Sequence, residues 1–221
     1  MLGGVETESG DWGRRNRIDF GCPSAPAPLP ARPAMHRSFI TKRLLPLLLT
    51  AAVLVPGLAV ANTGRSTNEE SLRRTMAARL LQHSGVALLD FHVSGRRDEA
   101  TAKHNLVQTA SGKPAKRSYY SNAPGGVTQL DTRMLRAMLI LVSEGYTFRV
   151  TEFAGGSHSS NSRHYQGVAF DIDTLNGQRI SYGHPSYRTF LKRCRQLGAT
   201  EILGPGTRGH SRHLHVAWPR K

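Results

Sequence analysis

The stretch SRHYQGVAFDID, residues 162–173, contains the clearest strand pattern of the chain. Side chains of a strand point alternately to its two faces. One face is therefore apolar and suits a core: Val168, Phe170 and Ile172. The opposite face carries Ala169, Asp171 and Asp173. The pattern predicts a strand over 168–173 that is buried on one side and presents carboxylates on the other.

A histidine lies just before this strand. His164 precedes Asp171 by seven residues, and Gly167 stands between them. Glycine adopts backbone conformations that other residues avoid. We expect the chain to turn at Gly167, so that both side chains can reach one point.

The chain ends with a second strand pattern, HLHVAW over residues 213–218. His213 and His215 are two residues apart and share one face, whereas Leu214 and Val216 face the core. Two imidazoles at the end of one strand and an acid on another can meet at one site if the strands are neighbours.

The remaining sequence predicts an α+β domain. Apolar residues at helical spacing predict helices over 68–83, 130–145 and 185–197. The second begins at a capping box formed by Thr128 and Asp131. Further strands are expected over 86–93, 146–153 and 200–203, and the polar segment 94–126 is expected to be loop or short irregular strands. These elements suggest a small, mostly antiparallel sheet flanked by helices.

The first 61 residues do not look like part of this domain. Residues 1–34 are proline-rich without apolar periodicity, and we interpret them as a non-native or disordered upstream extension. Residues 35–61 run from a basic start through an apolar stretch to Ala59-Val60-Ala61, the layout of a secretory signal peptide. A membrane anchor is disfavoured by Pro46 and Pro56. The mature domain is then 62–221, and membrane contact is expected only through the signal peptide.

The chain is strongly basic, with a net charge of +15. This charge suits a polyanionic partner such as cell-wall polymer, membrane lipid or nucleic acid. Export disfavours nucleic acid, and no nucleic-acid-binding motif argues for it. Cys194 has no partner cysteine in 62–221, so no internal disulfide is expected and a buried thiol is predicted. We expect an exported monomer in the periplasm, the medium or the cell wall.

Histidines and an aspartate from separate segments are residue types that bind a catalytic zinc ion. Such an ion takes three nitrogen or oxygen ligands and leaves a fourth position to water. The sequence therefore predicts Zn²⁺ as the cofactor.

The motif Ser162-x-His164-x-x-Gly167-x-Ala169-x-Asp171, together with His213-x-His215, resembles the zinc D-Ala-D-Ala peptidases. These are grouped with lysostaphin-type endopeptidases and the hedgehog signalling domain. The resemblance covers about residues 128–219. It implies a hedgehog/DD-peptidase-like fold, with the zinc site on the sheet.

The resemblance also implies roles for individual residues. His164, Asp171 and His215 would bind zinc, His213 would act on the water, and Ser162 would support the site. His210 resembles the extra histidine of the penicillin-insensitive murein endopeptidase branch.

One departure concerns the general base. Several members of the family place an acid just before the last histidine ligand, where this chain has Ser211, Arg212 and Leu214. His213 is therefore the first candidate for the base, and Glu201 and Asp173 are alternatives.

The roles of three other residues near the motifs are left open by the sequence. Arg212 is a candidate for binding a substrate carboxylate. His158 and His184 lie in loops beside the motifs, where a role toward substrate and no role are both open.

These features favour an exported zinc metallopeptidase acting on peptidoglycan stem peptides or cross-links, as a DD-carboxypeptidase or an endopeptidase. The alternative is a zinc-containing, non-catalytic cell-wall binding module of the same fold.

Overall fold

A computed structural model describes residues 63–220 of the chain. Its centre is a mixed sheet with the strand order β1-β4-β5-β8-β7, in which β6 pairs with β5. The strands are β1 (Val86–Leu88), β4 (Phe148–Glu152), β5 (Ala169–Leu175), β6 (Gln178–Arg179), β7 (Glu201–Leu203) and β8 (Leu214–Ala217). β1 and β4 are parallel, and the other pairs in this sheet are antiparallel. The α+β class is confirmed.

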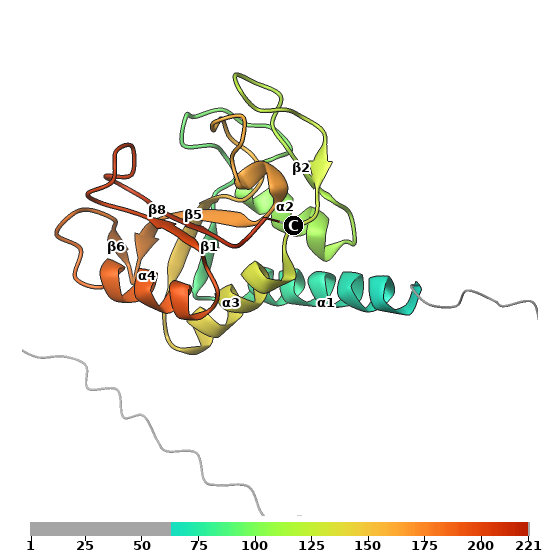
Figure 1. The fold of residues 1–221 in the computed structure, drawn as a ribbon, viewed down its shortest axis with the longest axis horizontal. Coiled ribbons are helices and arrows are strands. Elements are labelled where there is room, and N and C mark those ends of the chain that lie inside the picture. Colours follow the sequence, from blue (N-terminus) through green and yellow to red (C-terminus); the bar gives the residue numbers. More distant parts are fainter. Residues whose placement is uncertain (1–62, 221) are drawn as a thin grey trace, which may run out of the picture. The chain divides into compact units, whose positions relative to one another are not determined.

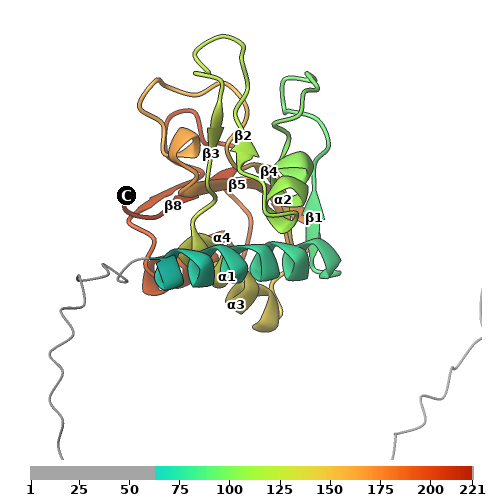
Figure 2. The ribbon, with the colours of Figure 1, turned by 90° about the vertical axis from the view of Figure 1, so that its right-hand side faces the viewer.

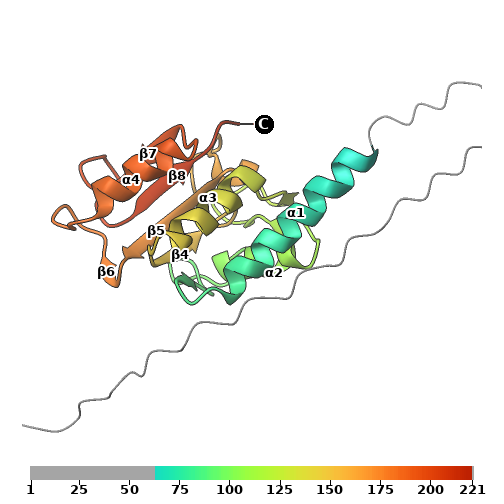
Figure 3. The same cartoon turned by 90° about the horizontal axis from the view of Figure 1, so that it is seen from below.

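Helices cover one face of this sheet (Figures 1 and 3). They are α1 (Thr63–Gln82), α3 (Thr132–Ser143) and α4 (Tyr187–Gln196). The short pair β2 (Ala115–Lys116) and β3 (Val127–Thr128) rises with several loops on the other side of the sheet, as Figure 2 shows. The loop side of the sheet is thus left free of long helices.

The core lies between the sheet and the helices. Phe170 of β5 is fully buried and stacks with Phe148 of β4 at 6.3 Å and with Trp218 at 6.0 Å between ring centroids. Met138 of α3 and Phe190 of α4 are also fully buried. The apolar face predicted for residues 168–173 therefore packs into the core. Cys194 is buried, as predicted.

The segment 94–126 was predicted as loop or short irregular strands, which is correct for its loops and for β2 but wrong for one helix. It contains the helix α2 (Ala102–Ala110), which Thr101 caps by accepting a hydrogen bond from the His104 N–H. Two polar residues of α2, Asn105 and Thr109, are buried. Asn105 donates to the Lys116 carbonyl oxygen and accepts from the Ala154 N–H, so polar residues occupy part of the buried face of this helix and the sequence shows no apolar stripe there.

Two boundaries also differ from the prediction. Asp131 caps α3 and accepts from the Arg133 N–H, while Thr128 lies in β3, so the predicted capping box is wrong. β1 ends at Leu88, and the predicted strand over 86–93 continues as a loop.

The predicted extension and signal peptide fall outside the described residues. Within residues 63–220, no helix has the length and apolar character needed to cross a membrane.

Candidate metal centre

Strands β5 and β8 bring the first two site residues together. They are antiparallel neighbours, and Asp171 lies directly opposite His215 in their register. Opposed residues of an antiparallel pair project from the same face and approach closely. The His215 Nδ1 atom consequently lies 2.8 Å from Asp171 Oδ1.

The third residue comes from the turn before β5. His164 begins the short 3-10 helix η1 (His164–Gln166), which ends at Gly167 with a φ of 67°. A side chain at Gly167 would also collide with the Gln129 carbonyl oxygen, because its Cβ would lie 2.4 Å away. Glycine is required here for the turn that directs His164 toward β5.

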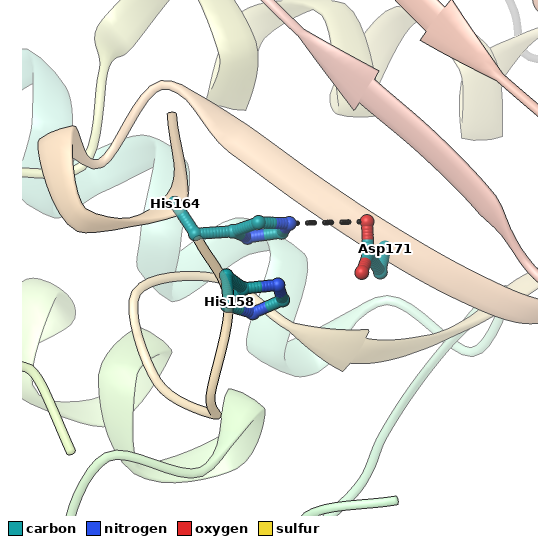
Figure 4. A group of neighbouring side chains, drawn as sticks. All are labelled: His158, His164 and Asp171. Atoms are coloured by element: carbon teal, nitrogen blue, oxygen red, sulfur yellow. Dashed lines mark hydrogen bonds and ion pairs between the residues drawn. The ribbon is translucent and has the colours of Figure 1, made fainter. Parts of the chain in front are cut away.

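The three side chains converge as a metal site requires. His164 Nε2 lies 3.2 Å from Asp171 Oδ1 and 3.0 Å from His215 Nδ1. Zinc bonds of roughly 2.0–2.1 Å in a tetrahedral arrangement place ligand atoms about 3.3 Å apart. All three residues are buried, and Figure 4 shows His164 directed at Asp171. The donor set therefore fits zinc.

Outer contacts fix the orientation of both imidazoles. His164 donates its Nδ1–H to the Phe153 carbonyl oxygen at 2.7 Å, which leaves Nε2 free for a metal. His215 Nε2 lies 3.0 Å from Glu201 Oε1, on the side of the ring away from Asp171. Such outer partners hold ligand histidines in one tautomer. This contact favours Glu201 as a partner of His215 over its predicted role as general base.

The local electrostatics agree with a site for a cation. Burial alone would raise the pKa of Asp171, but His164 and His215 hold it well below its usual value. Burial opposes protonation of His164, yet Asp171 raises its pKa.

His213 lies at the edge of the same site. Its Nε2 is 3.9 Å from Asp171 Oδ2, and its side chain is 30% exposed. Burial lowers its pKa, with the neighbouring histidines acting in the same direction and Asp171 against it. The neutral imidazole is close enough to the ligands to act on a water there.

The structure argues against a site role for one of the remaining predicted residues and places the others at the cavity. Asp173 is paired with Arg149 at 2.6 Å and Arg179 at 2.8 Å, which leaves no free carboxylate for a base. The Ser162 hydroxyl accepts from the His164 N–H at 3.3 Å, in keeping with support of the site. Together with the ligands, the predicted residues His210, Arg212 and Glu201 line one cavity of about 1180 Å³.

Of three further cavity residues, His158 was left open by the sequence, and Glu152 and His92 were not predicted as site residues. His158 has a ring nitrogen within 4.8 Å of the ligand atoms of His164 and Asp171. Glu152 of β4 lies opposite Asp171 in the register of β4 and β5, and its Oε1 accepts from His92 Nδ1 at 2.8 Å. Glu152 lies on the strand predicted over 146–153. The sequence did not show which strand pairs with it, so the position of Glu152 opposite Asp171 could not be predicted.

A comparison with curated proteins gives one distant match. A 59-residue stretch is 41% identical to the zinc D-Ala-D-Ala carboxypeptidase of Streptomyces albus G. The match covers 27% of this chain, and the chain spans 20% of the length of that relative. No family model matches, and no solved structure matches. The similarity to a zinc carboxypeptidase is therefore partial.

Proposed function

We propose that this chain is an exported zinc metallopeptidase that hydrolyses peptide bonds in peptidoglycan stem peptides or cross-links. The observation that carries the proposal is the convergence of His164, Asp171 and His215 within 3.2 Å of one another. The partial similarity to a zinc D-Ala-D-Ala carboxypeptidase supports the same chemistry.

The residues of the site would divide the work of hydrolysis. His164, Asp171 and His215 would hold zinc, which when bound lowers the pKa of water toward about 7 and polarises a carbonyl group. His213 would take a proton from the attacking water and deliver it to the leaving amine, as a general base and then a general acid. Glu201 would keep His215 in the tautomer that binds the metal.

The cavity also suits an anionic peptide. Arg212 is exposed on its wall, and a guanidinium can bind a carboxylate through two parallel hydrogen bonds. We propose Arg212 as the contact for a stem-peptide carboxylate. The net charge of +15 would favour approach to an anionic wall.

Incubation of the purified protein with muropeptides, followed by mass spectrometry, tests the proposal. We expect zinc-dependent release of D-Ala or splitting of dimeric muropeptides, and loss of this activity in His164→Ala and Asp171→Ala. His83→Ala is the matched control, because His83 lies at the end of α1 and does not line the cavity. Folded ligand variants with full activity would refute the site, and muropeptide binding without cleavage would favour the binding module.

A further inference from the structure

The segment 174–200, which contains α4, has basic residues but no acidic ones. It has no Asp or Glu, and the Lys and Arg residues that it contains are Arg179, Arg188, Lys192, Arg193 and Arg195. Two of these have acidic partners outside the segment. Arg179 pairs with Asp173 at 2.8 Å, and Arg193 donates to Glu144 at 3.0 Å. The other three form no ion pair within residues 63–220, the part of the chain that the structure describes.

These three cations lie along one face of α4, and we call them the α4 stripe. Arg188, Lys192 and Arg195 are four and three residues apart, the spacing that places side chains one above another on a helix. All three are exposed, whereas Phe190 and Cys194 on the opposite face are buried in the core. The α4 stripe extends over roughly 10 Å along the helix axis. It therefore presents a short row of cations to the surroundings.

Two tyrosines hold one end of the α4 stripe in place. The Nε–H of Arg188 donates to the Tyr187 hydroxyl at 3.1 Å, and its guanidinium group lies over the ring of Tyr182, 5.8 Å from the centroid. A cation at this distance from an aromatic face is attracted by it. A side chain that is already held loses less conformational freedom when it binds a ligand. Arg188 is thus prepared to bind an anion from solution.

The α4 stripe and the candidate metal centre lie on different sides of the sheet. Helix α4 belongs to the layer of helices that covers one face, whereas the loops rise on the other face (Figures 1 and 2). The cavity is lined by loop residues such as those of 156–163 and 209–213, and no residue of the α4 stripe lines it. A partner bound to the α4 stripe would therefore leave the cavity free for a peptide.

We propose that the α4 stripe binds a linear wall polymer that carries a phosphodiester in each repeat, and so holds the enzyme on the wall while the cavity acts on peptides. The charges of such a polymer repeat along its length, so neighbouring phosphates can contact the row of cations together. A lipid bilayer fits less well, because a helix that lies in a membrane surface inserts its apolar side chains, and those of α4 are buried in the core. This inference rests on the proposed action at the cell wall.

The test compares the wild type with a stripe variant that combines Arg188→Gln, Lys192→Gln and Arg195→Gln. Calorimetry would measure binding of poly(glycerol phosphate) at low salt, and cleavage of soluble muropeptides would be measured in parallel. We expect the stripe variant to bind the polymer about 10–100-fold more weakly, because each exposed charge contact contributes a factor of a few. The difference should shrink as salt is added, since salt screens exposed charges. Cleavage of soluble muropeptides should be unchanged, because α4 does not line the cavity.

A control variant, Arg74→Gln with Lys103→Gln and Lys113→Gln, removes the same charge from exposed positions outside α4 and should bind the polymer nearly as the wild type does. Equal weakening in the two variants, or full binding by the stripe variant, would overturn the inference and leave the peptidase function intact. Stripe-dependent binding to phosphatidylglycerol vesicles without binding to the polymer would overturn it in favour of a membrane. Stripe-dependent polymer binding by a protein that cleaves no muropeptide would support the α4 stripe and overturn the proposed function.

Discussion

The buried imidazole of His92 should make the stability of the domain depend on pH above neutrality. His92 is 1% exposed and lies between two carboxylates, Glu152 Oε1 at 2.8 Å and Asp98 Oδ1 at 2.7 Å. Burial opposes its charge, but Glu152 and Asp98 raise the pKa of His92 from 6.5 to about 9. The folded protein therefore binds this proton more tightly than the unfolded chain.

The size and the direction of the effect follow from proton linkage. At about 1.4 kcal/mol for each pKa unit, the shift corresponds to about 3 kcal/mol of folding free energy. Because the folded-state pKa is the higher one, this stability is fully present below pH 6.5. It is lost progressively as the pH rises through about 9.

Urea unfolding of the zinc-loaded protein at pH 6.5 and pH 9 measures this loss. We would compare the wild type with His92→Gln, which keeps a polar side chain but does not titrate. The wild type should lose about 2.5 kcal/mol more than the variant between these pH values, since part of the effect lies outside this range. Equal losses in the two proteins would refute the assignment of a shared, tightly held proton to His92.

Two further substitutions test the outer contacts and the core. Glu201→Gln should weaken zinc binding by about 10–100-fold, since it removes the carboxylate that orients His215, and competition with a chelator would show this. Zinc affinity equal to that of the wild type would argue against a positioning role for Glu201. Phe170→Ala should lower the free energy of unfolding by about 3–5 kcal/mol, because Phe170 is fully buried between Phe148 and Trp218. Urea unfolding checks this, and a loss below about 1 kcal/mol would mean that the core closes around the gap.

Local sequence pattern was sufficient to predict individual strands and helices and the face that each buries. The alternation in 168–173 correctly assigned Phe170 and Ile172 to the core, and the apolar stripe of 130–145 correctly indicated α3. The pattern could not show that β5 and β8 are neighbours, because strand pairing depends on contacts between distant segments. The resemblance to the zinc peptidases supplied that link between Asp171 and His215.

Other features escaped prediction for a physical reason. Helix α2 buries Asn105 and Thr109, whose hydrogen bonds replace the apolar contacts that sequence patterns detect. The position of His158 depends on a loop closed by Tyr165 and by glycines that have no side chains to pack. Neither arrangement has a periodicity, so both become visible only when the partners are placed in space.

The three carboxylates of β4 and β5 show how register assigns chemistry. Asp171 lies between two imidazoles, Asp173 lies between two arginines, and Glu152 is paired with His92. The arginines hold the pKa of Asp173 low against the effect of burial, whereas burial raises the pKa of Glu152. Since these residues differ little as isolated side chains, their neighbours decide which of them can bind a metal. In this chain the antiparallel pairing of β5 with β8 gives that position to Asp171, because it is the carboxylate that the pairing sets against His215.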